Sequence, residues 1–96
     1  MKSLTEARAE LDAVDRQIVR LFEMRMEISR DVARYKIAHD LPVLDRSREE
    51  QVLDSRTAML TDPYWGPSVR RLYETIMAIS RAEQQSLLDQ TAQEEP

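Results

Sequence analysis

Apolar side chains recur at helical spacing along the first third of the chain. Between Leu4 and about Ala38 no Gly or Pro interrupts this spacing, and the sequence "HDLPV" follows. The apolar positions are Leu11, Val14, Ile18, Leu21, Phe22, Ile28 and Val32. Steps of three, four and seven residues are typical of the buried face of an amphipathic helix. The pattern therefore predicts one long helix.

Two further stretches predict shorter helices. One runs from about Arg46 to Leu60 and the other from about Ser68 to Asp89, with the loop "TDPYWGPS" between them. The inner face predicted for the last helix comprises Val69, Leu72, Ile76, Ile79 and Leu87. The final residues, "TAQEEP", are polar and are expected to form a frayed tail. We therefore expect an all-α protein with one helical domain over residues 1–90 and a polar C-terminal tail over residues 91–96.

The length of the first helix bears on oligomeric state. At 1.5 Å per residue it forms a rod of roughly 50 Å, whereas a compact domain of this size has a radius of gyration of about 12–13 Å. Two shorter helices cannot cover such a rod. A homodimer in which the long helices pack against each other is expected.

Composition excludes several classes of protein. The 96 residues are 42% hydrophobic and 33% charged, with no apolar run long enough for a membrane span or signal peptide. The chain has no Cys and one His, so disulfides, thiolate metal sites and a zinc site are not expected. The net charge of −4 argues against a nucleic-acid partner. We expect a cytoplasmic protein with neither metal nor cofactor.

Helical phase separates two groups of cations on the long helix. With Ile18 as the centre of the apolar stripe and roughly 100° per residue, Arg25 lies within about 20° of the centre and Lys36 almost on it. Arg8 lies near the edge, at about 80°. The solvent face, roughly 120–160° away, carries Arg16, Arg20, Arg30 and Arg34. A cation that faces the interior of a helical bundle lowers the stability of the fold unless an anion pairs with it. Such cations either pair with Asp or Glu of a neighbouring helix or bind an anionic ligand in the bundle.

Distance along the helix adds a constraint. Arg8 and Arg25 are 17 residues apart, which corresponds to roughly 25 Å. The Arg8 and Arg25 side chains of one chain therefore cannot both contact the same small molecule. In an antiparallel dimer, Arg8 of one chain can approach Arg25 of the other, giving two shared sites.

The last two helices also carry polar residues that need an explanation. "VLDRSREE" contains two candidate helix caps, Asp45 and Ser47, the latter in a capping box with Glu50. In the last helix, Ser80 lies near the apolar stripe and Gln84 at its edge, either as a satisfied core pair or as ligand donors. Glu83 falls near the same stripe and has no assigned role.

Together these residues resemble the all-helical chorismate mutase family. The resemblance is carried by the order Arg8, Arg25, Lys36, then Asp45-x-x-Arg48-Glu49, then Ser80-x-x-x-Gln84. It covers nearly the whole chain, including "ELDAVDRQIVRLFEMRMEIS", "LPVLDRSREE" and "IMAISRAEQQSLL". The family fold is an intertwined dimer of three-helix chains with two active sites, which agrees with the length of the first helix.

The resemblance implies roles for these residues. Arg25, and Arg8 of the partner subunit, would bind the two carboxylates of chorismate, with Ser80 assisting and Arg48 reinforcing the cluster near the ring. Lys36 and Gln84 would donate to the ether oxygen. Glu49 and the backbone at Asp45 would hold the ring hydroxyl. Lys36, Gln84 and Arg48 are thus the predicted catalytic residues, in a rearrangement without a covalent intermediate.

Three alternatives remain at this stage. The same scaffold can act on 4-amino-4-deoxychorismate, since Glu49 could accept a hydrogen bond from an ammonium group. It can also eliminate pyruvate from isochorismate, although the Asp45-x-x-Arg48-Glu49 group favours the mutase. A non-catalytic helical dimerisation or regulatory module is a different class, and it would leave Arg25 and Lys36 paired internally. The sequence does not distinguish a free enzyme from a domain of a larger protein.

Overall fold

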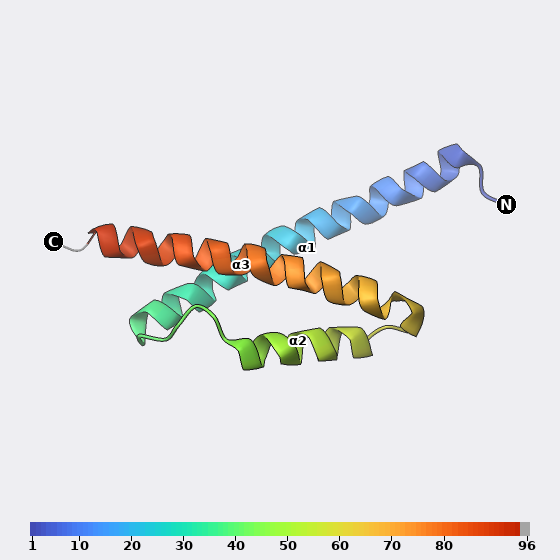
Figure 1. Ribbon diagram of the computed structural model, residues 1–96. Helices are drawn as coiled ribbons and strands as arrows, with labels where there is room; N and C mark the ends of the chain where they lie inside the picture. Colours follow the sequence, from blue (N-terminus) through green and yellow to red (C-terminus); the bar gives the residue numbers. More distant parts are fainter. Residues whose placement is uncertain (95–96) are drawn as a thin grey trace.

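The computed structural model describes residues 1–94, and these form three α-helices and one short 3₁₀ helix (Figure 1). The elements are α1 (Leu4–Ala38), α2 (Arg46–Ala58), η1 (Pro63–Trp65) and α3 (Gly66–Glu94). The prediction of an all-α chain with one long and two shorter helices is confirmed.

Local capping groups fix both ends of α1. The Ser3 hydroxyl accepts a hydrogen bond from the Glu6 N–H at 3.1 Å, which satisfies a free donor of the first turn. At the other end Asp40 adopts a left-handed conformation with φ 53°, and the Leu41 N–H donates to the Lys36 carbonyl at 2.8 Å. This is a Schellman-type stop, which turns the chain back beside Lys36.

The start of α2 decides between the two candidate caps. Asp45 is the N-cap residue, and its side chain accepts a hydrogen bond from the Arg48 N–H at 3.0 Å. Ser47 lies within the first turn of α2. A carboxylate at this position also interacts favourably with the positive end of the helix dipole.

The C-terminal helix is longer than the sequence pattern predicts. We expected a helix over residues 68–89, but α3 begins at Gly66 and continues to Glu94. Pro67 is compatible with a first turn, because proline there loses no helical hydrogen bond. No glycine or proline interrupts residues 89–94, and the Thr91 hydroxyl donates to the Leu87 carbonyl at 2.9 Å. The frayed tail predicted for residues 91–96 is therefore wrong for residues 91–94, and residues 95–96 lie outside the described part.

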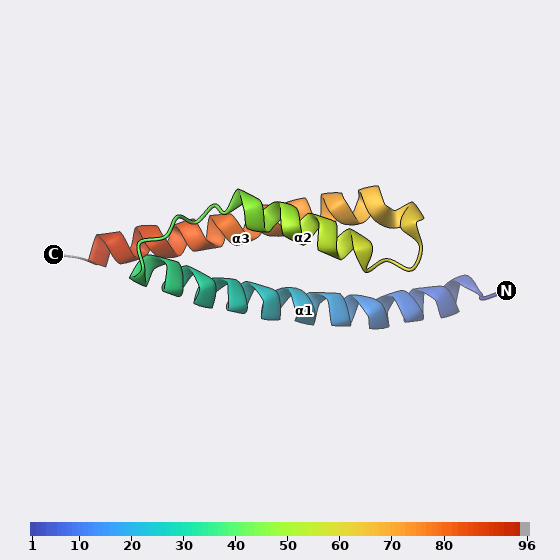
Figure 2. The same ribbon diagram turned by 90° about the horizontal axis from the view of Figure 1, so that it is seen from below.

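The core of the described chain is small. Val52 and Leu53 of α2 pack with Met77 of α3, and the Tyr73 ring packs against this cluster. Ala33 is the most buried apolar residue of α1. Helix α3 contacts both other helices, and Figure 2 shows α1 running beneath α2 and α3. The three helices thus meet along α3.

Arg70 ties α2 to α3 outside this core. It forms salt bridges with Glu50 at 3.0 Å and Asp54 at 3.3 Å. The hydrogen bond with Asp54, followed by the charge of Glu50, raises the pKa of the Arg70 guanidinium.

Most of the apolar stripe predicted for α1 is exposed in the single chain. Phe22 is 38% exposed and Leu21 60%, and the other five predicted positions lie between these values. In Figure 1 the N-terminal half of α1 diverges from α3. The radius of gyration is 17.3 Å, well above the roughly 12–13 Å of a compact domain.

The inner face predicted for α3 is also only partly covered. Leu72 is 54% exposed and Ile79 40%, whereas Met77, Ser80 and Gln84 are buried. Val69, Ile76 and Leu87 are half-buried, so the predicted stripe coincides only in part with the face that packs within the chain. Within residues 1–94, no helix has the length and apolar character required to cross a membrane.

Candidate active site

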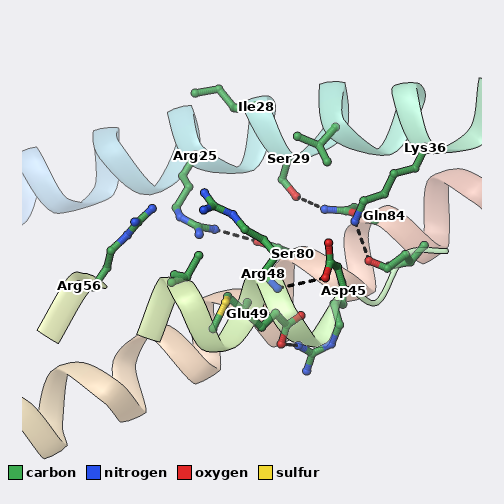
Figure 3. A pocket seen from close by; sticks show the side chains of 15 residues that line it. Arg25, Ile28, Ser29, Lys36, Asp45, Arg48, Glu49, Arg56, Ser80 and Gln84 are labelled. Atoms are coloured by element: carbon green, nitrogen blue, oxygen red, sulfur yellow. Dashed lines mark hydrogen bonds and ion pairs between the residues drawn. The ribbon is translucent and has the colours of Figure 1, made fainter. Parts of the chain in front are cut away.

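A cavity of about 330 Å³ lies between the three helices and the segment that joins α1 to α2 (Figure 3). Its charged lining consists of five cations and two carboxylates, a surplus of three positive charges in a chain of net charge −4. They are Arg25, Lys36, Arg48, Arg56 and Arg81, with Asp45 and Glu49. A cavity with this charge balance suits an anionic ligand.

Seven of the eight predicted site residues line this cavity. They are Arg25, Lys36, Asp45, Arg48, Glu49, Ser80 and Gln84. Arg8 does not line it, because it lies 17 residues before Arg25 on the same helix, or roughly 25 Å away. The described chain therefore contains the predicted cluster without Arg8.

Arg25 enters the cavity from α1 with a neutral partner. Its Nη1 donates to the Ser80 hydroxyl at 3.2 Å, and its guanidinium carbon lies 5.9 Å from the centre of the Tyr73 ring. Across residues 1–94, no carboxylate forms a salt bridge with Arg25. The interpretation that this inward cation pairs with an acid of a neighbouring helix is wrong for the described chain.

Lys36 is held at the end of α1 by neutral acceptors as well. Its Nζ donates to the Val43 carbonyl at 2.7 Å and to Gln84 Oε1 at 3.3 Å. In the part of the chain that the structure describes, Lys36 too forms no salt bridge. An ammonium has three donors, so one remains for a ligand.

Gln84 is oriented by a hydrogen bond that the sequence did not predict. Its Nε2 donates to the Ser29 hydroxyl at 2.9 Å, and both residues are 7% exposed. The amide oxygen faces Lys36, so both ends of the amide have a partner. One of the two Nε2 protons remains free. Lys36 and Gln84, which both line the cavity, thus each keep one donor without a partner among the described residues.

The wall formed by α2 combines a helix cap with charged side chains. The Asp45 carboxylate caps α2, and the Arg48 Nη1 donates to Gln51 at 2.9 Å. The Glu49 carboxylate accepts a hydrogen bond from Arg81 of α3. In Figure 3 the Arg56 side chain reaches from α2 toward the side of the cavity where Arg25 lies.

Ser29, Arg56 and Arg81 are polar lining residues that the sequence analysis missed. Helical phase offers a signal for two of them. Ser29 is four residues after Arg25 and seven before Lys36, and Arg56 is seven after Glu49. These spacings place side chains on one helix face. Arg81 follows Ser80 directly and has no such signal, because its partner lies on another helix.

Glu83, which had no assigned role, lies outside the cavity. Its carboxylate pairs with Arg30 of α1 at 3.1 Å, with side chains 43% and 54% exposed, respectively. An exposed pair of this kind contributes about 1 kcal/mol or less. Glu83 therefore links α1 and α3 at the surface.

These observations define an all-helical protein with a cationic ligand cavity between its helices. Residues 7–85 match the family described as chorismate mutase type II. Because this match covers most of the chain, the protein belongs to that family, and the resemblance recognised from the sequence is confirmed.

One curated relative is the T-protein of Haemophilus influenzae. It is 36% identical over 56 residues, which cover 58% of this chain and 15% of the relative. The chain thus spans only a small part of the length of that protein. No solved structure matches the chain.

Proposed function

We propose that this protein is a chorismate mutase that rearranges chorismate to prephenate, in two sites shared between the chains of a homodimer. The proposal is supported by the observation that Arg25 and Lys36 line one cavity and, among residues 1–94, have only neutral hydrogen-bond partners. Their charges remain available to an anionic substrate. A non-catalytic module with internally paired cations does not account for this arrangement.

The rearrangement needs positioning rather than a nucleophile. One C–O bond of chorismate breaks while one C–C bond forms within the same molecule, and no proton is transferred. Arginines that clamp the two carboxylates favour the folded geometry in which the reacting carbons meet. Arg25 and Arg8 of the partner subunit would supply this clamp, with Ser80 assisting and Arg48 reinforcing the cluster near the ring.

The ether oxygen gains negative charge as its bond lengthens. The free donors of Lys36 and Gln84 would stabilise that charge more strongly in the transition state than in the substrate. A millionfold acceleration needs about 8 kcal/mol, and one preorganised donor supplies about 3–4 kcal/mol. Two such donors, together with arginines that hold the substrate in its folded geometry, would therefore be sufficient for an acceleration of this size.

A homodimer would complete both the core and the site. The exposed apolar stripe of α1 needs a partner surface, and a second long helix has the matching length and character. Antiparallel packing would bring Arg8 of the partner subunit toward the cavity. By two-fold symmetry each dimer would hold two such sites.

The direct test is to incubate the protein separately with chorismate, isochorismate and 4-amino-4-deoxychorismate and identify the products. We expect prephenate from chorismate as the fastest reaction. Release of pyruvate from isochorismate as the main activity would contradict the proposal and indicate a lyase. No reaction with any of the three would favour a non-catalytic module.

Mixing two inactive variants tests the shared site. Arg8→Ala and Lys36→Ala each disable both sites of their own dimer, but after subunit exchange a mixed dimer has one intact site. An equal mixture should recover about a quarter of wild-type activity, because half the dimers are mixed and half their sites are intact.

The matched control mixes Arg25→Ala with Lys36→Ala. These residues line the same cavity of one chain, so every site of the mixed dimer carries one defect and no recovery is expected. Equal recovery in both mixtures, or none in either after exchange is verified, would count against a site completed by Arg8.

Substitutions of Lys36 and Gln84 test the role of the ether-oxygen donors. Both should reduce kcat more than they weaken substrate binding, because the charge they meet develops in the transition state. Lys36→Ala should cost about 3 kcal/mol or more, since a charged donor outweighs a neutral one. Arg34→Ala is the control, because Arg34 is exposed and pairs with Asp31 outside the cavity.

The Gln84→Glu variant adds a pH test. A protonated carboxyl can still donate, whereas an ionised one repels the growing charge, so activity should be present at low pH and fade as pH rises. Lys36 favours the ionised form and moves this loss toward lower pH. A pH-independent rate equal to that of wild type would contradict a role of Gln84 as a donor to the ether oxygen.

A further inference from the structure

The ion pair between Arg81 of α3 and Glu49 of α2 is the one salt bridge of residues 1–94 that lies in the cavity wall. Its side chains are 37% and 24% exposed, respectively. The other salt bridges of these residues involve no cavity-lining side chain. Glu49 is therefore the one acid of the cavity whose charge is directly offset by an arginine.

Glu49 is also the best acceptor for a donor on the substrate. The cavity holds two carboxylates, and that of Asp45 already accepts the Arg48 N–H as the cap of α2. With both acids of chorismate ionised, its ring hydroxyl is its one hydrogen-bond donor, and it needs an acceptor in the cavity. A carboxylate bound to Arg81 keeps further lone pairs for this purpose.

We propose that Arg81 determines substrate specificity, by making this cavity prefer a neutral hydroxyl over an ammonium at the ring position that faces Glu49. The inference rests on the proposed function and concerns the choice between chorismate and 4-amino-4-deoxychorismate. An unpaired Glu49 carboxylate would attract an ammonium more strongly than a hydroxyl. Arg81 offsets that attraction and leaves the hydrogen-bond acceptor in place.

The charge balance of the cavity acts in the same direction. With Arg81 present the lining has a surplus of three positive charges, which disfavours a substrate carrying an additional cation. Arg81 acts through Glu49 and the local field and is a positioning residue in this account. Arg8, Arg25 and Lys36 keep their proposed roles toward the carboxylates and the ether oxygen.

The test compares kcat/KM for chorismate and for 4-amino-4-deoxychorismate in wild type, Arg81→Gln and Arg81→Lys. The preference for chorismate should fall by up to about fivefold in Arg81→Gln and by more than about twofold, a modest shift because the pair is partly exposed. Arg81→Lys keeps the charge and should stay within about twofold of wild type. If the amino compound is not turned over, its inhibition constant against chorismate gives the same comparison.

Arg70→Gln is the matched control. Arg70 is another arginine of α3 that pairs with carboxylates of α2, but it lies outside the cavity. Its loss should leave the substrate preference unchanged. If Arg81 only fastened α2 to α3, Arg81→Gln would lower stability and both rates together at constant preference, and that result would overturn the proposal.

Glu49→Gln keeps the proposal testable if Arg81→Gln does not fold. Removing the carboxylate should increase the preference for chorismate, and a decrease would contradict the proposal. In the Glu49→Gln background, adding Arg81→Gln should shift the preference less than it does in wild type, since only the contribution of Arg81 to the local field remains. If wild type did not turn over chorismate, that result would contradict the proposed function and therefore this inference as well.

Discussion

The arrangement of this site depends on two cations of α1 that face inward and form no salt bridge with any acid of residues 1–94. Placing a charge away from water is costly unless polar partners compensate. Both side chains are half-buried and have such partners: Arg25 has the Ser80 hydroxyl and the face of the Tyr73 ring, and Lys36 has the Val43 carbonyl and Gln84. Neutral partners hold the side chains in place and leave their charges available, which is the condition for binding an anion.

Several local features follow from holding these cations in position. The Schellman-type stop at Asp40 turns the chain so that the Val43 carbonyl meets Lys36. The cap at Asp45 then starts α2 beside the cavity, and its first turn supplies the charged wall. From α3, Gln84 reaches Lys36 and is itself held by Ser29. The same short segment between α1 and α2 therefore both caps α2 and lines the cavity.

The sequence predicted the helices well because glycine and proline are few and the apolar spacing is regular. The ends of α1 agree with the expectation, and the start of α2 agrees as well. The end of α3 was wrong, since polarity alone does not end a helix that no proline or glycine interrupts. The inner face predicted for α3 is only partly covered in the single chain, because periodicity identifies an apolar face without identifying what covers it.

Site residues were predictable where one helix face carries the signal. Phase on α1 singled out Arg25 and Lys36, and the same argument applied to polar residues would have found Ser29. Arg81 could not be predicted in this way, because its place in the cavity wall depends on an ion pair with Glu49 of another helix. Arg8 differs from both of these examples. Its distance from Arg25 along α1 follows from the sequence, but Arg8 can reach a cavity only if a second chain brings it there.

The most direct measurement is a crystal structure of the protein with a stable bicyclic dicarboxylate shaped like the folded substrate. We expect a dimer with one ligand in each cavity, its carboxylates on Arg25 and on Arg8 of the partner subunit, and its ether oxygen near both Lys36 and Gln84. A ligand bound elsewhere, or a filled cavity with Arg8 of both chains left in solvent, would contradict this expectation.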